Sequence, residues 1–151
     1  MGGSEYMALK GKTGANVPKV NPRKARVLYE ALSNAIARGL AASCHDCSDG
    51  GLGVALAESA FAGGYGMDLD IRGIPVENAA IALFSESQSR FVVTVHPENV
   101  AAFQEMLAGR PVTRLGTVIA SEEFRLIGHD GAAIRASLAD LKEAWQRPLR
   151  W

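Results

Sequence analysis

Several features that mark specialised classes of protein are scarce in this sequence. It has only 2 cysteines among 151 residues, which is too few for a disulfide framework. Its 16 Lys and Arg residues balance 16 Asp and Glu residues, so no excess positive charge attracts nucleic acid or an anionic membrane surface. The central uncharged stretch at residues 59–67 is about half as long as the roughly 18 apolar residues that a membrane helix needs. We therefore expect neither nucleic acid nor a membrane as a partner.

The composition is that of one folded domain. Hydrophobic residues make up 48% of the chain and charged residues 21%, a balance that excludes a disordered chain. A length of 151 residues allows a substantial core but is short for two ordinary domains. Residues 1–6 have neither the basic start nor the apolar run of a secretory signal, so we expect a cytoplasmic location.

Hydrophobic spacing and turn residues divide the chain into an arm and a domain. Residues 1–20 are rich in glycine and poor in large apolar side chains, which predicts an extended linker or docking arm. The domain is predicted to span residues 21–151. Helical spacing predicts helices at 21–39, 52–63, 75–83, 97–109 and 137–145. Alternating or β-branched runs predict strands at 40–44, 67–71, 90–95, 112–120, 123–127 and 132–135.

The order of these elements favours a layered mixed β-sheet with helices packed on it. Helices and strands alternate along most of the chain, as they do in proteins with parallel sheets. However, the Asp130-Gly131 pair is a tight-turn signal that joins the last two strands as an antiparallel hairpin. We therefore predict an α+β fold rather than a fully parallel, doubly wound one.

No set of residues predicts a catalytic triad or a metal site. Cys44 and Cys47 have the spacing of a zinc or redox pair, but zinc needs four ligands and the sequence has no second pair. The 3 histidines are scattered along the chain without a Ser or Cys partner. We interpret the cysteines as ordinary thiols and predict no catalytic and no metal-binding residue.

Two polar loops are the candidates for ligand binding. The loop at 46–53, D-C-S-D-G-G-L-G, precedes a helix, whose free N–H groups and positive end favour an anion. Alternatively, Asp49 caps the helix and the glycines only allow a tight turn. The loop at 85–90, S-E-S-Q-S-R, either binds hydroxyl or phosphate groups or is simply solvated. The candidate substrate- or phosphate-binding residues are Asp49, Gly50, Gly51, Ser85, Glu86, Ser87, Gln88 and Arg90.

These two loops also carry a resemblance to a known family. The segments H-D-C-S-D-G-G-L at 45–52, F-A-G-G at 61–64 and L-F-S-E-S-Q-S-R-F at 83–91 resemble the carboxy-terminal domain of phosphoribosylformylglycinamidine synthase. That family belongs to the superfamily of aminoimidazole ribonucleotide synthase, so the resemblance implies the fold of the carboxy-terminal domain of that enzyme. It also implies a place in de novo purine biosynthesis, where formylglycinamide ribonucleotide, ATP and glutamine-derived ammonia give the amidine.

The resemblance further implies cofactors and partners that lie outside this chain. ATP and Mg2+ serve the intact enzyme, and its partners are the amino-terminal ATP-binding domains and a glutamine amidotransferase. The family's catalytic histidines and its ATP- and metal-binding residues lie in those amino-terminal domains. We therefore expect this chain to be inactive alone and to bind neither cofactor tightly.

Three alternatives stay open at this point. The resemblance implies two copies of a two-domain unit in the intact enzyme, and residues 145–151 resemble the end of the second copy. The Glu-Ser-Gln that holds substrate in the family belongs to the first copy. Glu86, Ser87 and Gln88 therefore either bind ligand or are structural. The chain could instead be the second domain of a selenophosphate synthetase or a thiamine-phosphate kinase. It could also be a stand-alone module that self-associates into a homo-oligomer.

Overall fold

The computed structural model describes residues 1–76 and 78–149, and it confirms the α+β class. Arg150 and Trp151, which end the stretch at 145–151, lie outside the described residues. Among the described residues, no helix is both long and apolar enough to cross a bilayer. In chain order the elements are α1 (Glu5–Leu9), α2 (Pro22–Ala37), β1 (Ser43–Asp46), α3 (Gly51–Gly63), β2 (Gly66–Asp70), α4 (Ala79–Phe84), β3 (Phe91–Thr94), η1 (Pro97–Asn99), α5 (Val100–Met106), β4 (Gly116–Ile119), β5 (Glu123–Ile127), η2 (His129–Gly131), β6 (Ala133–Ser137), α6 (Leu138–Gln146) and η3 (Arg147–Leu149).

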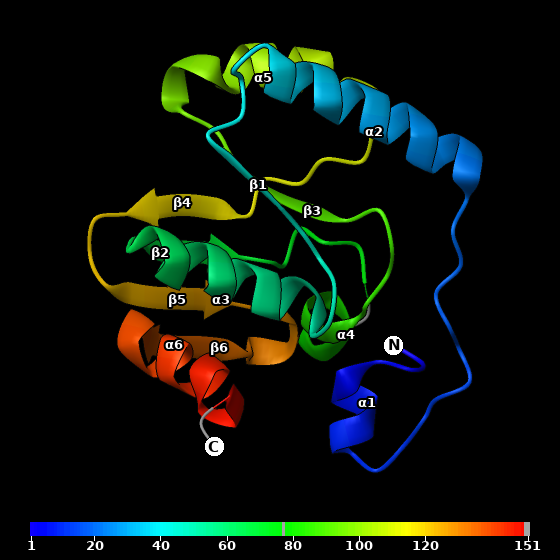
Figure 1. The fold of residues 1–151 in the computed structure, drawn as a ribbon, viewed down its shortest axis with the longest axis vertical. Coiled ribbons are helices and arrows are strands. Elements are labelled where there is room, and N and C mark those ends of the chain that lie inside the picture. The colour runs from blue at the N-terminus through cyan, green and yellow to red at the C-terminus, as the bar shows by residue number, and fades with distance from the viewer. Residues whose placement is uncertain (77, 150–151) are drawn as a thin grey trace.

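A mixed four-stranded sheet in the order β4-β2-β5-β6 forms the centre of the molecule. The central strands β2 and β5 are parallel, whereas β4 and β6 run antiparallel to their neighbours. The last two strands form the predicted hairpin, with Asp130 in the turn between them at a φ of 57°. Helices α3 and α6 lie on one face of this sheet (Figure 1). The layered mixed sheet is therefore confirmed.

Alternation along the central strands separates the core from the solvent. Met67 and Leu69 on β2 are buried beneath the helices together with Leu126 on β5. Asp68 points to the opposite face, where its carboxylate lies 3.3 Å from the Arg125 guanidinium of the paired strand. Full burial of one such aliphatic side chain contributes about 1.5–3 kcal/mol, so the helix-covered face supplies most of the stability of the sheet.

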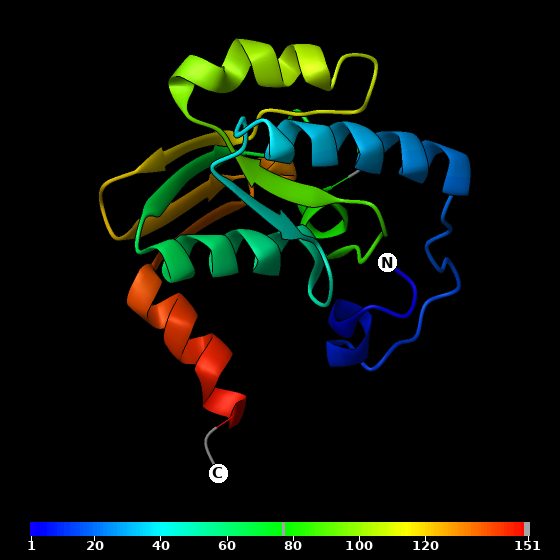
Figure 2. The same ribbon diagram turned by 45° about the horizontal axis from the view of Figure 1, so that its top comes forward.

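A second, smaller core lies where α2 and α5 pack together. Strands β1 and β3 form a separate two-stranded antiparallel ribbon instead of joining the main sheet. On β3, Val92 belongs to the main core, whereas Phe91 and Val93 pack against the cluster that contains Leu32 and Phe103. The ribbon therefore joins the two cores, and Figure 2 shows α2 and α5 side by side above it.

Helix starts follow the capping residues of the sequence. Asn21 caps α2 and Ser137 caps α6, each side chain accepting a hydrogen bond from a backbone N–H three residues later, as their positions predict. By contrast, α4 begins at Ala79 rather than at Pro75, because the Asn78 side chain caps it by accepting a bond from the Ile81 N–H. The strand predicted at 40–44 lies at Ser43–Asp46, and the one at 112–120 is limited to Gly116–Ile119.

The arm differs from the prediction of an extended segment. Residues 5–9 form the short helix α1, because the Ser4 side chain caps it by accepting a hydrogen bond from the Met7 N–H. Two backbone bonds close a loop behind this helix, from the Gly2 N–H to the Asn16 oxygen and from the Gly3 N–H to the Thr13 oxygen. The boundary between arm and domain at residue 20 stays a prediction.

Candidate functional site

The structure brings the two polar loops together at the N-terminal end of α3. The first loop, residues 46–50, leads from β1 into that helix, and the second, residues 85–90, connects α4 to β3. The Cys47 N–H donates to the Arg90 oxygen at 2.9 Å, and the Gly50 N–H donates to Glu86 Oε1 at 2.8 Å. Segments that are 36 residues apart in the chain thus form one surface.

Gly51 makes this close approach possible. Its φ is +65°, and a Cβ atom there would lie 2.6 Å from the Ser85 oxygen and 2.7 Å from the Leu83 oxygen. Both atoms belong to the backbone, so neither can rotate away as a side chain could. Only glycine allows α3 to begin against the second loop in this geometry.

Glu86, in the second loop, binds both the first loop and the arm through one oxygen atom. Besides the Gly50 N–H, its Oε1 accepts a hydrogen bond of 2.9 Å from the Glu5 N–H at the start of α1. A carboxylate at the N-terminal end of α3 also complements the positive end of the helix dipole. The sequence predicts that the N-terminal end of α3 favours an anion, and the Glu86 carboxylate already occupies part of that position.

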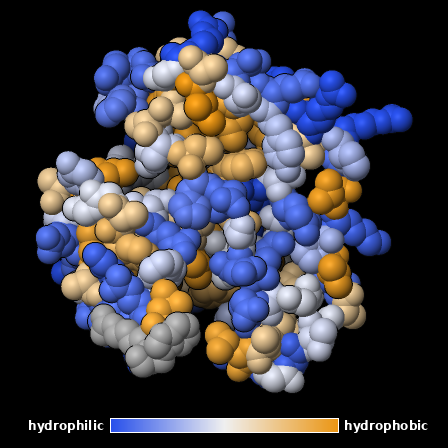
Figure 3. Space-filling model, in the orientation of Figure 1, coloured by the Kyte–Doolittle hydropathy of each residue, from blue (hydrophilic) through white to orange (hydrophobic). Residues whose placement is uncertain are grey.

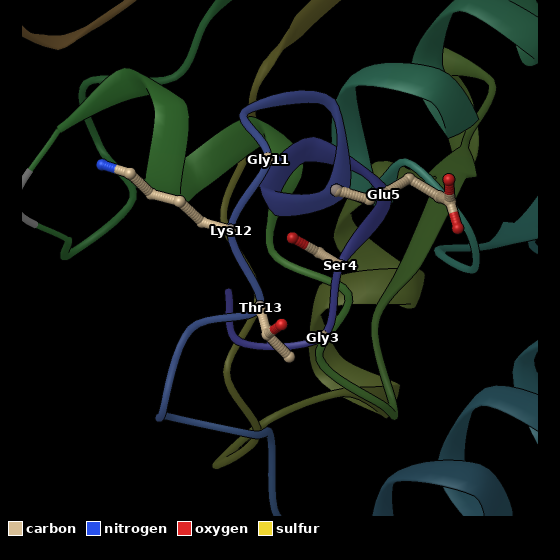
Figure 4. Close-up of a pocket in the computed structure, with 7 residues that line it drawn as sticks. Gly3, Ser4, Glu5, Gly11, Lys12 and Thr13 are labelled. Carbon is tan, nitrogen blue, oxygen red and sulfur yellow. The ribbon is translucent and has the colours of Figure 1, made fainter.

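The arm contributes to the same region. The Tyr6 ring stacks on the Phe84 ring, with centroids 4.9 Å apart and an interplanar angle of 5°. Beside α1 the arm lines an open surface hollow of about 320 Å3. Figure 4 shows that the side chains of Glu5 and Lys12 at this hollow extend away from each other. Sequence reasoning allowed for a docking arm at residues 1–20 but missed the helix α1 within it, for which the Ser4 cap was a local signal.

Ser85 and Arg90 serve the end of α4. Ser85 is buried, and its hydroxyl donates to the Ile81 oxygen at 2.7 Å. The Arg90 guanidinium donates to the Ser85 oxygen at 2.8 Å and to the Ala82 oxygen at 2.9 Å. These donors satisfy the carbonyl groups that the end of a helix leaves without partners.

The remaining predicted residues face the solvent. Asp49 and Gln88 are exposed, and Ser87 is partly exposed. Gly50, not Asp49, is the N-cap residue of α3, so the interpretation of Asp49 as a cap is wrong. Within residues 1–76 and 78–149, the side chains of Asp49, Ser87 and Gln88 make no hydrogen bond. Their polar groups are therefore available to meet a ligand at this surface.

The cysteine pair has no reactive environment. Cys47 is buried, and burial raises the pKa of its thiol. Cys44 is exposed on β1, where partial desolvation, together with the nearby Asp46 carboxylate, raises the pKa of its thiol. Among the described residues, no three His, Cys, Asp or Glu side chains gather in a way that could hold a metal ion.

A second polar cluster, which the sequence did not indicate, bridges β1, α3 and α6. The Glu58 carboxylate accepts a hydrogen bond of 2.8 Å from the Trp145 indole, and its other oxygen lies 3.3 Å from His45 Nε2. The Nδ1 atom of His45 donates to the Asp46 oxygen at 2.6 Å. The cluster lies at a surface hollow of about 550 Å3, beside Phe61. The face in Figure 3 mixes hydrophilic and hydrophobic surface around these elements.

The arrangement of sheet, helices and paired loops defines a class of α+β domain that also occurs in solved structures. One is Thermotoga maritima PurL complexed with FGAR, with a TM-score of 0.73 and 20% identity, covering 87% of this chain and 23% of that one. Another is the structure of PurLQS from Thermotoga maritima, with a TM-score of 0.69 and 22% identity, covering 81% of this chain and 22% of that one. At these identities, the likeness shows the fold.

The family follows from the sequence comparisons. The family model described as AIR synthase related protein, C-terminal domain, matches residues 1–129, and the chain belongs to this family. The phosphoribosylformylglycinamidine synthase subunit PurL of Alkaliphilus metalliredigens is 37% identical over 154 residues, which cover 99% of this chain and 20% of the relative. The PurL subunit of Leuconostoc mesenteroides is 46% identical over 109 residues, covering 72% of this chain and 14% of the relative.

These comparisons confirm the resemblance that the two loops carry. They also set its scope, because the chain spans about a fifth of the length of the curated relatives that match most of it.

Proposed function

We propose that this chain acts as the carboxy-terminal domain of a phosphoribosylformylglycinamidine synthase. In the intact enzyme it would form one wall of a cleft whose other wall is an amino-terminal ATP-binding domain. The reaction converts formylglycinamide ribonucleotide, ATP and glutamine-derived ammonia to the amidine in the cytoplasm. The observation that carries this proposal is the match of 99% of the chain to a relative named as the PurL subunit of that enzyme.

The geometry of the paired loops supports a role as a wall. Glu86, Ser85 and Arg90 are used within the domain, which fixes the shape of the surface. Asp49, Ser87 and Gln88 present a carboxylate, a hydroxyl and an amide on that fixed surface. Such groups suit the hydroxyl and amide groups of a ribonucleotide better than its phosphate, because Asp49 and Glu86 are both acidic.

We assign ATP and Mg2+ to the intact enzyme rather than to this chain. Asp46 and Asp49 are the carboxylates of the glycine loop, and the Asp46 carboxylate is engaged by the Ser48 hydroxyl at 2.5 Å. That hydrogen bond lowers the pKa of the Asp46 carboxyl group. Among the described residues, no three His, Cys, Asp or Glu side chains are arranged to hold a metal ion, whereas Mg2+ prefers an octahedral oxygen shell with substrate phosphates.

The proposed partners are the amino-terminal domains and a glutamine amidotransferase. A solved PurLQS assembly from Thermotoga maritima contains a chain with this fold, which supports a place in a multi-subunit enzyme. The matching curated relatives carry the PurL name, which favours this enzyme over selenophosphate synthetase and thiamine-phosphate kinase. Homo-oligomer formation stays an alternative that sedimentation at several concentrations tests.

A domain exchange tests the proposal directly. The matching segment of the Alkaliphilus metalliredigens PurL subunit would be replaced by this chain, and amidine formation would be measured with an ammonium salt as the nitrogen source. We expect the folded chimera to retain activity, because the wall of the cleft is preserved. A chimera that is folded by circular dichroism and gel filtration but forms no amidine would contradict the proposal.

The isolated chain provides the complementary measurement. With formylglycinamide ribonucleotide, ATP, Mg2+ and an ammonium salt, we expect no amidine. Calorimetric titration of ADP with Mg2+ is expected to give no heat of tight binding. Turnover by the chain alone would show that the groups that activate the substrate lie within these residues.

A further inference from the structure

One oxygen atom of Glu86 joins two segments that are far apart in the sequence. Its Oε1 accepts the Glu5 N–H, 81 residues away, and the Gly50 N–H, 36 residues away. A carboxylate oxygen has two lone pairs, so these two donors occupy it fully. Hydrogen bonds to an ionised acceptor are also about twice as strong as bonds between neutral groups.

We propose that Glu86 is a positioning residue that couples docking of the arm, residues 1–9, to the conformation of the glycine loop, residues 46–51. When the arm is docked, the shared oxygen is held between both N–H groups. When the arm is released, the Glu86 side chain regains rotational freedom and holds the glycine loop less firmly. This coupling goes beyond the proposed function and does not depend on it.

At the arm, α1 lies at the surface although the serine that caps it is buried. Helix α1 has only 5 residues, none of them buried, so its own hydrogen bonds cannot keep it in place. Its ring contact is the stack of Tyr6 on Phe84, with centroids 4.9 Å apart. This stack and the bond from the Glu5 N–H to Glu86 therefore both contribute to docking of α1.

The loop end of the connection needs an external acceptor. Gly50 has a φ of 77° and is the N-cap of α3 without a side chain that could form a capping hydrogen bond. Glu86 does not replace that cap, but its carboxylate accepts the hydrogen bond from the N–H of Gly50 itself, as the glutamate of a capping box does at an N-cap residue. Loss of this acceptor leaves a partly buried N–H without its partner at the point where the glycine loop becomes helix.

A second route between arm and loop exists and can be separated from the first. The Phe84 ring that carries Tyr6 also lies close to α3, because a Cβ atom on Gly53 would be 3.2 Å from it. Release of the arm could therefore reach α3 through packing instead of through the carboxylate. A double-mutant cycle between Tyr6 and Glu86 distinguishes the two routes.

Amide hydrogen exchange of the full 151-residue chain, followed by NMR, measures the protection of the Glu5 and Gly50 amides in one experiment. We expect Glu86→Ala to lower the protection of the Glu5 and Gly50 amides together, by about tenfold or more. Tyr6→Ala is expected to lower protection at Gly50 as well as at Glu5, and to have no further effect on Gly50 once Glu86 is alanine. Glu86→Gln keeps an acceptor oxygen without the charge and should restore part of the protection.

Glu105→Ala, which removes an exposed glutamate of α5, is the matched control and should leave both amides unchanged. The proposal is overturned if Tyr6→Ala leaves Gly50 unaffected, or if its effect on Gly50 persists in the Glu86→Ala background. If Glu86→Ala does not fold, the double-mutant cycle is repeated with Glu86→Gln. The proposal then requires that Tyr6→Ala has a smaller effect on the Gly50 amide in the Glu86→Gln background than in the unmodified chain.

Discussion

Replacing Gly51 with alanine probes the closest approach between the two loops. The substitution places a Cβ atom at a φ of +65°, which costs an L-residue about 1–2 kcal/mol. It also places that atom 2.6 Å and 2.7 Å from two backbone oxygens of the second loop, which must move apart. Overpacking of this kind costs about 1–3 kcal/mol, so we expect Gly51→Ala to lower the free energy of unfolding by about 2–5 kcal/mol.

Gly64 provides a matched control within the same helix. It ends α3 with a φ of +71°, and a Cβ atom there would meet nothing within 4 Å. Gly64→Ala should therefore show only the conformational cost of about 1–2 kcal/mol. Urea unfolding followed by circular dichroism gives both values. Equal losses at Gly51 and Gly64 would refute the argument that the second loop presses on the start of α3.

Three further predictions concern the surroundings of the site. Arg90→Ala removes both guanidinium bonds to the end of α4 and should cost about 2–3 kcal/mol in urea unfolding. Hydrogen bonds from Arg72 lower the pKa of Asp70 to about 2. The ionised carboxylate therefore stabilises the fold above its ordinary pKa, near 4, and this stabilisation is lost as the pH falls through about 2. Arg72→Ala should raise the pKa of Asp70 in an NMR titration and reduce the acid-induced loss of stability. Iodoacetamide followed by mass spectrometry should label exposed Cys44 in the native chain and buried Cys47 only after unfolding; equal labelling would contradict the burial of Cys47.

Local signals in the sequence predict most of the secondary structure. Asn21 and Ser137 sit at helix starts where their short polar side chains can reach a backbone N–H, and the structure uses both. The alternation around Met67 and the turn at Asp130 likewise predict β2 and the final hairpin. These elements depend on neighbours in the chain, so their residues alone are informative.

Features that depend on distant contacts were not predicted. The sequence does not indicate that β1 pairs with β3 in a separate sheet, because strand partners are chosen by packing between segments that are far apart. The interaction of Glu58 with Trp145 has the same origin, since these residues are 87 positions apart in the chain. The start of α4 is an error of another kind, because Pro75 and Asn78 both suit a helix start and only the structure selects Asn78.

The candidate site illustrates both cases. Its two loops were found by composition, and the structure places them side by side at the end of α3. Which of their residues are structural and which are free to bind a ligand could not be predicted, because Ser85 and Ser87 differ only in what surrounds them. Burial commits Ser85 to the Ile81 oxygen, whereas the Ser87 side chain stays partly exposed.

The exposed residues of the two loops provide a test of the proposed cleft wall. Asp49, Ser87 and Gln88 make no hydrogen bonds within residues 1–76 and 78–149, so alanine at each position should change the free energy of unfolding by less than about 0.5 kcal/mol. In the active chimera, loss of one hydrogen bond to the ribonucleotide should lower kcat/KM by about tenfold. Variants that keep both full stability and full kcat/KM would show that this surface faces away from the substrate, even if the chimera itself is active.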